Sequence, residues 1–202
     1  MTRRLGVLIS GRGSNLQSII DAVAEGRLDA TIAVVVSNRN DAAGLERARA
    51  AGIEAVHLNP KDYSGRGAYD QALVDLLRGR RVDLVCLAGF MRLVGAPLLQ
   101  GFPGRILNIH PSLLPSFPGL DAQQQALAHG VRVSGATVHF VTAELDGGPI
   151  ILQSAVPVLP GDSVDALSAR ILVEEHRLYP DAIRIVLEGR WRLDGRRVVL
   201  PA

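Results

Sequence analysis

The chain has few of the residues that build disulfide frameworks, metal centres or membrane spans. Its one cysteine among 202 residues, Cys86, lies in an apolar stretch, where a thiol is usually a small buried hydrophobe. With no second cysteine to form a disulfide, a cytoplasmic location is expected. The five histidines and the cysteine show no metal-ligand spacing, so we expect no metal. The first apolar segment is too short for a signal sequence, and no apolar run approaches the roughly 20 residues of a membrane helix.

Aromatic residues and an excess of one charge are also scarce. Aromatics make up 4% of the chain, and 22 Lys and Arg face 20 Asp and Glu, a formal net charge of +2. A basic face interleaved with aromatic side chains, as nucleic-acid-binding proteins use, is missing. We therefore expect small-molecule substrates and neither a nucleic-acid nor a membrane partner. A homodimer is one of the oligomeric states that the sequence leaves open.

What the chain does contain is an alternation of strand-like and helix-like segments. With 48% hydrophobic and 21% charged residues it has the composition of a globular protein. The strand-like segments of the first half are residues 5–9, 31–36, 54–58, 83–88 and 105–109. The helix-like segments are residues 16–26, 42–51 and 67–77. This rhythm predicts an α/β protein with a Rossmann-like, doubly wound, mostly parallel sheet and helices on both faces.

The second half of the chain has longer strand-like and helix-like segments than the first half. Residues 135–141 and 149–158 look like longer strands, and the short link between them favours an antiparallel pair and thus a mixed sheet. A long helix is expected from residue 163 to about 189, with Asp162 or Ser163 as its N-cap and Pro180 as a kink or a break. Residues 191–199 predict a hairpin that turns at an Asp-Gly pair. No linker or repeat is visible, so a single domain over residues 1–202 is predicted.

The most informative motif places an amide and an imidazole two residues apart at the end of an apolar run. Side chains alternate faces along a strand, so Asn108 and His110 project to the same side, about 7 Å apart. Pro111 then ends the strand, because it lacks an N–H. Open α/β sheets place their chemistry at the carboxyl ends of strands. An amide that steadies an oxyanion and a ring that moves a proton suit a reaction at a carbonyl.

A glycine-rich loop follows the first strand. Gly11 and Gly13 let the backbone approach an anion, while Ser14 and Asn15 add donors at a helix N-terminus. A dinucleotide site would want a third glycine where Leu16 stands, and an acid directly after the second strand. A phosphate monoester is therefore the favoured ligand, and a plain glycine-rich turn is the alternative.

Asp146 lies in a turn between the two longer strands. A carboxylate there can orient the imidazole of His110 or raise its pKa. Taken alone, an Asp-Gly pair is more often an ordinary turn. The other histidines, including His57, His129 and His139, are interpreted as structural or surface residues.

Four motifs together resemble the glycinamide ribonucleotide formyltransferases of purine biosynthesis. They are residues 10–15, 87–92, 107–115 and 138–150, and they follow the family's order over nearly the whole chain. The resemblance implies the formyltransferase fold, with a phosphate-binding N-terminal half and a folate-binding C-terminal half. It also implies transfer of the formyl group of 10-formyltetrahydrofolate to the glycine amine of glycinamide ribonucleotide, through a tetrahedral species and without a covalent enzyme intermediate.

The resemblance also implies a set of site residues. Asn108, His110 and Asp146 would be the catalytic set. Gly13, Ser14 and Asn15 would hold the substrate phosphate, and Glu175 the ribose or glycinamide part, although its neighbour Glu174 is an alternative. The residues that would contact the folate are Arg66, Met91, Arg92, Leu93, Val94 and Asn108.

One departure from the family is visible, and rival functions remain open. Family members often carry histidine shortly after the pair Pro118-Gly119, where this chain has Asp121-Ala122-Gln123. A formyltetrahydrofolate hydrolase would use the same amide, imidazole and carboxylate with water as acceptor, but usually carries an extra N-terminal module. A methionyl-tRNA formyltransferase would want an added C-terminal domain and a basic face. A non-enzymatic nucleotide-binding module would leave Asn108 and His110 as incidental strand-end residues.

Overall fold

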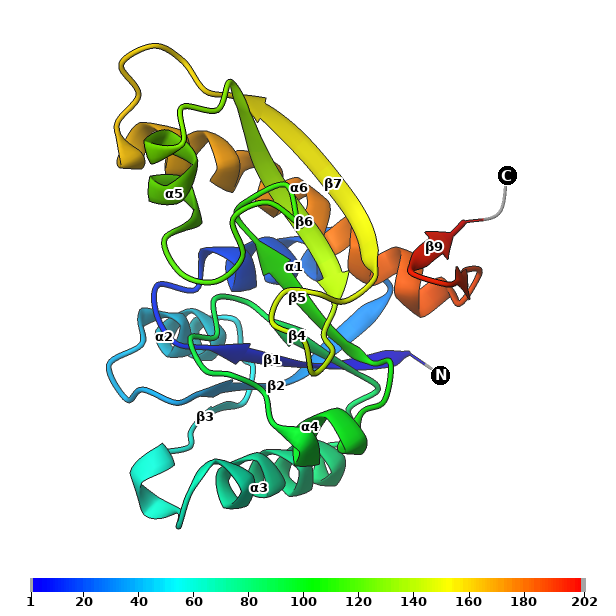
Figure 1. Ribbon diagram of the computed structural model, residues 1–202. Helices are drawn as coiled ribbons and strands as arrows, with labels where there is room; N and C mark the ends of the chain where they lie inside the picture. Colours follow the sequence, from blue (N-terminus) through cyan, green and yellow to red (C-terminus); the bar gives the residue numbers. More distant parts are fainter. Residues whose placement is uncertain (1, 201–202) are drawn as a thin grey trace. The chain divides into compact units, whose positions relative to one another are not determined.

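The computed structural model describes residues 2–200 (Figure 1). The chain divides into two compact units, the first ending at Leu107 and the second beginning at Asn108. Strand β5 (Ile106–His110) crosses this boundary and ends directly before Pro111, as the sequence predicts.

The first unit is a parallel α/β layer in the strand order β3-β2-β1-β4. Its strands are β1 (Arg3–Ile9), β2 (Ala30–Ser37), β3 (Ala55–His57) and β4 (Leu84–Leu87). Its helices are α1 (Ser14–Ala24), α2 (Ala43–Ala50), the 3-10 turn η1 (Pro60–Asp62), α3 (Arg66–Gly79) and α4 (Ala96–Gly101). β1 pairs in parallel with both β2 and β4, and β2 with β3. β1, β2 and β4 read as largely apolar runs because most of their residues are buried on both faces of the sheet, whereas the short β3 is partly exposed.

The strand order sets the faces on which the helices lie. Strands β2 and β3 follow one another on one side of β1. Strand β4 lies on the other side of β1, so the chain crosses back over β1 between β3 and β4. Since crossovers between parallel strands are right-handed, α1 and α2 cover one face and α3 the other. The contacts agree: α1 touches α2, and α3 touches α4. The loops after β1 and β4 therefore flank the point where the strand order reverses, which is where ligands bind in such sheets.

The second unit pairs its strands in the order β5-β6-β7-β9-β8. β6 (Val133–Phe140) and β7 (Ile150–Pro157) form the predicted antiparallel pair, and β8 (Arg192–Asp194) and β9 (Arg197–Val199) form the predicted hairpin. Helix α5 (Ala122–Ala128) touches α6 (Val164–Glu188), which packs on β6 and β7 (Figure 1).

Helix α6 begins where the sequence predicts and passes through its proline. The Ser163 side chain accepts a hydrogen bond from the backbone N–H of Ala166, so Ser163 and not Asp162 is the N-cap. The expectation that Pro180 breaks the helix is wrong, since α6 continues to Glu188. Burial of Leu167, Ile171 and other apolar residues against β6 and β7 outweighs the hydrogen bond that the proline removes.

The structure confirms the predicted α/β class with a mixed, mostly parallel sheet. Sequence reasoning missed the short helices α4 and α5 and the turn η1, because segments of three to seven residues are too short to show a helical period. Cys86 is fully buried, as expected. Within residues 2–200, no helix combines the length and the apolar character that crossing a bilayer requires.

Candidate active site

The carboxylate of Asp146 is the centre of a buried polar cluster in the second unit. Its Oδ2 lies 3.5 Å from Nδ1 of His110, and its Oδ1 lies 3.5 Å from the amide nitrogen Nδ2 of Asn108. His110 is 5% exposed and the Asp146 side chain is 10% exposed. The amide, imidazole and carboxylate that the sequence singled out therefore lie together.

The hydrogen-bond partners of His110 define the proton on one of its ring nitrogens. Nε2 lies 2.8 Å from the backbone oxygen of Phe117. A carbonyl oxygen only accepts, so Nε2 carries a hydrogen and donates it. Nδ1 then faces Asp146 over the longer distance. The ring is held firmly on one side and loosely on the other.

Asp146 is held over the cluster by the backbone as well as by the rings. Gly119 donates its N–H to Oδ2 of Asp146 at 2.8 Å. Both Asp146 (φ 49°) and Phe117 (φ 55°) adopt left-handed backbone conformations that are uncommon for residues other than glycine. Such conformations persist only where the surroundings hold them, and they cluster at functional sites. The turn at Asp146 is therefore more than an ordinary Asp-Gly reversal.

A second imidazole, His139 on β6, lies in the same cluster. Its Nε2 is 3.2 Å from Nδ2 of Asn108 and 3.7 Å from Oδ1 of Asp146, and its Nδ1 is 2.9 Å from the backbone oxygen of Phe140. Burial lowers the pKa of His139, outweighing the Phe140 carbonyl and the Asp146 carboxylate, which raise it. His139 is 2% exposed, so it is not a surface residue.

The sequence did not lead us to predict that His139 lies beside Asn108. A signal existed in the strand itself, because a histidine stands in a mostly apolar run that includes Ala136, Val138 and Phe140 and is buried from residue 134 to residue 140. A buried ring needs partners for both nitrogens, which makes such a residue a candidate for a polar network.

At the departure from the family pattern, other side chains order the loop. Nε2 of Gln125 donates to the backbone oxygens of Leu120 at 2.8 Å and Pro118 at 3.3 Å. The ring of His129 lies against that of Phe117, with centroids 5.1 Å apart. An amide on α5 thus fixes the loop that contributes Gly119 to the cluster, in a chain that lacks histidine at residues 121–123.

The glycine-rich loop lies in the first unit and packs against α2. Gly13 has φ 71° and precedes α1, and a Cβ on it would lie 2.6 Å from Cα of Gly44. The N–H of Gly44 in turn donates to the carbonyl of Gly11. Gly13 and Gly44 are therefore required for close packing of the loop on α2. The first turn of α1, which includes Ser14 and Asn15, follows the loop directly.

The loop after β4 carries four of the six residues that the resemblance assigns to folate, Met91, Arg92, Leu93 and Val94. Oγ of Ser10 accepts from the N–H of Met91 at 2.8 Å, and the same hydroxyl donates to Oδ1 of Asn38. The N–H of Ser10 donates to the carbonyl of Gly89. The loops that follow β1 and β4 are thus tied together. Arg66 lies exposed at the start of α3.

The far end of this loop rests on α3. Gly95 donates its N–H to Oδ2 of the buried Asp70, and burial raises the pKa of Asp70. The guanidinium of Arg92 lies 4.8 Å from the ring centre of Tyr69, and burial raises the pKa of Tyr69 to about 12. A cation over an aromatic face is a favourable contact that fixes the direction of the arginine.

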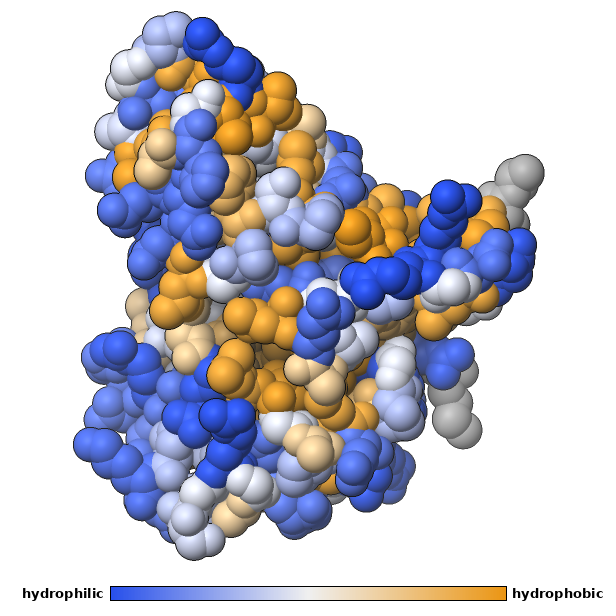
Figure 2. All heavy atoms as spheres, in the orientation of Figure 1, coloured by the Kyte–Doolittle hydropathy of each residue, from blue (hydrophilic) through white to orange (hydrophobic). Residues whose placement is uncertain are grey.

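Next to the Arg92 anchor, apolar side chains are left in solvent. Met91 is 67% exposed and Leu93 is 55% exposed. Figure 2 shows that apolar surface is interspersed with polar surface on the face it draws. Exposed apolar side chains beside a fixed arginine are suited to an aromatic ligand with a charged end.

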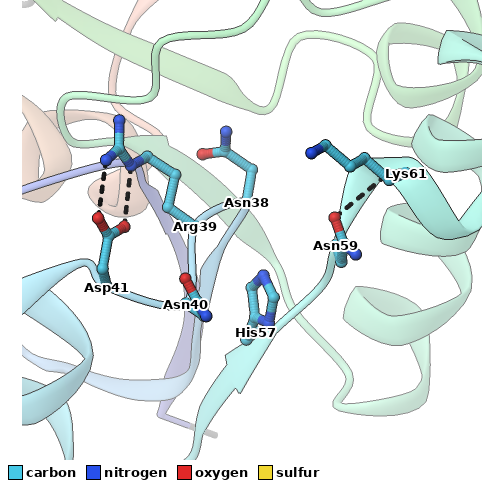
Figure 3. Close-up of a pocket in the computed structure, with 7 residues that line it drawn as sticks. All are labelled: Asn38, Arg39, Asn40, Asp41, His57, Asn59 and Lys61. Atoms are coloured by element: carbon cyan, nitrogen blue, oxygen red, sulfur yellow. Dashed lines mark hydrogen bonds and ion pairs between the residues drawn. The ribbon is translucent and has the colours of Figure 1, made fainter.

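A polar pocket of about 370 Å³ opens at the carboxyl ends of β2 and β3 (Figure 3). It is lined by Asn38, Arg39, Asn40, Asp41, His57, Asn59 and Lys61. The guanidinium of Arg39 turns to Asp41 and makes two hydrogen bonds, of 2.8 and 3.0 Å, so the two charges neutralise each other. In dinucleotide-binding sheets this position holds a ribose through an acid. Here Oδ1 of Asn38 instead accepts a hydrogen bond from the hydroxyl of Ser10, which precedes the glycine-rich loop.

The two glutamates of α6 differ in their surroundings. Oε2 of Glu174 accepts from Oγ of Ser154 and from the guanidinium of Arg177, both at 2.6 Å. Glu175 is the next residue along α6 and is 7% exposed. The carboxylate of Glu174 is therefore already engaged at the surface.

The predicted site residues fall into two groups. Asn108, His110, Asp146 and Glu175 belong to the second unit, and the structure brings the first three together. The glycine-rich loop and the segment that the resemblance assigns to folate belong to the first unit, where hydrogen bonds tie their neighbouring loops to each other.

Comparisons with known proteins identify the family of the chain. The formyl transferase family model matches residues 3–183. The phosphoribosylglycinamide formyltransferase of Escherichia coli is 48% identical, over 95% of this chain and 94% of that protein. The glycinamide ribonucleotide transformylase 1 of Symbiobacterium toebii, a crystal structure, is 62% identical with a TM-score of 0.98, covering 99% of this chain and 95% of the other.

A third similarity is to part of a longer protein. The trifunctional purine biosynthetic protein adenosine-3 of Bos taurus is 49% identical over 94% of this chain, which spans only 19% of that protein's length. The family model covers most of the chain, and the two bacterial relatives cover at least 95% of it. The resemblance inferred from the four motifs is confirmed, and the chain belongs to the formyl transferase family.

Proposed function

We propose that this chain transfers the formyl group of 10-formyltetrahydrofolate to the glycine amine of glycinamide ribonucleotide, a step of purine biosynthesis. We also propose that residues 1–202 form a single domain and that the protein is located in the cytoplasm. The observation that carries the proposal is the convergence of Asn108 and His110 on the carboxylate of Asp146. These are the groups that acyl transfer between two nitrogen atoms requires: a donor for the oxyanion and a route for the proton.

The reaction makes and breaks one carbon–nitrogen bond each. The neutral substrate amine attacks the formyl carbon, and the carbonyl oxygen becomes anionic in the tetrahedral species. Asn108 donates to that oxygen. As the species collapses, the bond from carbon to the folate nitrogen breaks, and one proton of the attacking amine passes to the departing nitrogen. No covalent enzyme intermediate is needed.

His110 and Asp146 handle the proton and the charge. The contact between Nε2 of His110 and Phe117 is short and keeps the ring in place, whereas the 3.5 Å contact between Nδ1 and Asp146 is long enough for a substrate oxygen or a water to replace it. Nδ1 then donates to the oxyanion, and Asp146 balances the charge of the imidazolium and relays the proton through water.

The binding groups follow from the surroundings described above. Gly13, Ser14 and Asn15 bind the substrate phosphate at the N-terminus of α1, where backbone N–H groups and the helix dipole favour an anion. Glu175 contacts the ribose or glycinamide, with its neighbour Glu174, which Ser154 and Arg177 engage, as the alternative.

The donor substrate binds to the loop after β4. Arg66, Arg92 and Asn108 supply polar contacts to the folate, and Met91, Leu93 and Val94 supply apolar ones. No metal takes part in this scheme. A homodimer stays a prediction, which light scattering tests.

A steady-state assay of the purified chain with both substrates tests the proposal. We expect formylated glycinamide ribonucleotide to appear in step with tetrahydrofolate. Asn108→Ala, His110→Ala and Asp146→Ala should each lower turnover by about 10²–10³-fold, the usual cost of an oxyanion donor. Release of formate without glycinamide ribonucleotide would indicate a formyltetrahydrofolate hydrolase instead, and a trapped formyl-enzyme adduct would contradict direct transfer.

A further inference from the structure

The geometry points to His139 as a positioning residue that fixes the orientation of the Asn108 amide, so that its NH2 group and not its oxygen faces the polar cluster. The inference rests on the proposed function and assigns a role to a residue outside the proposed catalytic set. It depends on which atoms of His139 and Asn108 carry hydrogens, and the neighbouring atoms decide this.

The tautomer of His139 is set by its own strand. Nδ1 lies 2.9 Å from the backbone oxygen of Phe140, which can only accept, so Nδ1 carries the hydrogen. In the neutral ring Nε2 is then an acceptor. The ring is neutral because it is 2% exposed and shares the cluster with His110, and two charged rings beside one carboxylate would bury a net positive charge.

The neutral ring in turn decides the orientation of the Asn108 amide. An acceptor at Nε2 of His139 attracts the NH2 end of the amide and repels its oxygen, so Nδ2 is the atom 3.2 Å away. Asp146, which also accepts, lies on the same side of the amide. Both neighbours favour the same one of the two orientations of the amide.

Three distances show that the NH2 group of Asn108 faces both neighbours. Nδ2 of Asn108 is 3.2 Å from His139 and 3.5 Å from Asp146, and those two acceptors are 3.7 Å apart. The angle between the acceptors at Nδ2 is therefore about 67°, whereas the two hydrogens of a planar amide diverge by about 120°. Each acceptor can take one hydrogen about 27° away from the N–H direction, so both neighbours hold the NH2 group in the cluster. Both contacts are long and bent, so an entering oxyanion can take one of the two hydrogens.

A glycine makes the arrangement sterically possible. A Cβ on Gly148 would lie 1.7 Å from the carbonyl oxygen of Phe140, the oxygen that accepts from His139. The N–H of Phe140 donates to the carbonyl of Pro149. The glycine two residues after Asp146 thus lets the chain approach β6 closely enough to hold Phe140, and through it the His139 ring.

A matched pair of variants separates the acceptor from the ring. His139→Gln places an amide oxygen near the position of Nε2 and retains an acceptor for Asn108. His139→Asn keeps a donor near Nδ1 for Phe140 but has no atom that reaches Asn108. We expect His139→Asn to lower kcat by about 10- to 100-fold, the scale of a misplaced reacting group, with little change in either KM. We expect His139→Gln to restore turnover to within a few-fold of the wild type.

A double variant shows whether His139 acts through Asn108. In an Asn108→Ala background, His139→Asn should cost almost no further activity, because the group to be positioned is already gone. Equal loss in the Asn and Gln variants, wild-type kcat in His139→Asn, or losses that multiply in the double variant would each overturn the inference. Thermal unfolding of every variant identifies those that fail to fold.

Nuclear magnetic resonance tests the same geometry without substrate. In the wild-type protein at neutral pH, the His139 ring should carry its proton on Nδ1, and the Asn108 side-chain amide signals should shift in His139→Asn but little in His139→Gln. A proton on Nε2 would overturn the inference whether or not the chain is active. Absence of formyl transfer by the wild type, with the expected ring spectrum, would reject the proposed function alone.

Discussion

Substituting Gly148 tests how tightly the Asp146 turn is fitted to β6. A Cβ on Gly148 would lie 1.7 Å from the Phe140 oxygen, and real Cβ atoms essentially never come closer than 3.0 Å to another heavy atom. The carbonyl or the turn must therefore move by more than about 1 Å. Gly148 has no positive φ, so steric overlap and not backbone strain is the cause.

The expected magnitude follows from the cost of overpacking. Forcing additional atoms into a well-packed site typically costs about 1–3 kcal/mol, and each kcal/mol lowers the melting temperature of a chain of this size by about 2–4 °C. A shift of this size also breaks the 2.9 Å contact between His139 and Phe140. We expect Gly148→Ala to lower both the melting temperature and kcat.

The neighbouring glycine is a matched control. A Cβ on Gly147 would meet only side-chain atoms of Glu144, which is exposed and can turn aside. Thermal unfolding and steady-state turnover of the two alanine variants should therefore differ, with Gly147→Ala close to the wild type. A Gly148→Ala protein with unchanged melting temperature and kcat would refute the reasoning, since the carbonyl would then have moved at no cost.

Three further outcomes are expected. Gly13→Ala should lower the melting temperature, because its φ is 71° and its Cβ would lie 2.6 Å from Gly44, whereas Gly11→Ala, with nothing within 4 Å, should not. Below pH about 6.5 the histidine of the unfolded chain takes up a proton that His139 in the folded protein, with its lowered pKa, does not. The free energy of unfolding should therefore decrease as the pH decreases, and the decrease should be smaller in His139→Gln. Equal pH dependence of the two proteins in urea titrations would contradict this. Arg196→Ala should change stability by less than about 1 kcal/mol although Arg196 donates to the carbonyl of Gly147, because its side chain is 73% exposed; a larger loss in a denaturant titration would show that the hairpin holds the turn firmly.

Much of the fold and the main motif were predictable from local sequence. The apolar runs of β1, β2 and β4 identify buried parallel strands because a strand that is covered on both faces has apolar residues at nearly every position. Asn108 and His110 could be paired from the sequence because strand geometry alone sets two alternate residues on one face. The N-cap at Ser163 and the turn at Gly195 are likewise local chemistry.

Tertiary contacts decided what those local patterns could not. His139 lies beside Asn108, 31 residues away, only because β6 meets its neighbours in one register, and no local pattern encodes that pairing. Helix α6 passes through Pro180 because packing against β6 and β7 outweighs a local preference. The sequence by itself determined which elements form and which residue types could do chemistry. The tertiary structure decided which ring accepts, which end of the Asn108 amide faces the cluster and which glycine has no room for a side chain, because those properties depend on atoms that meet only when distant segments pack together.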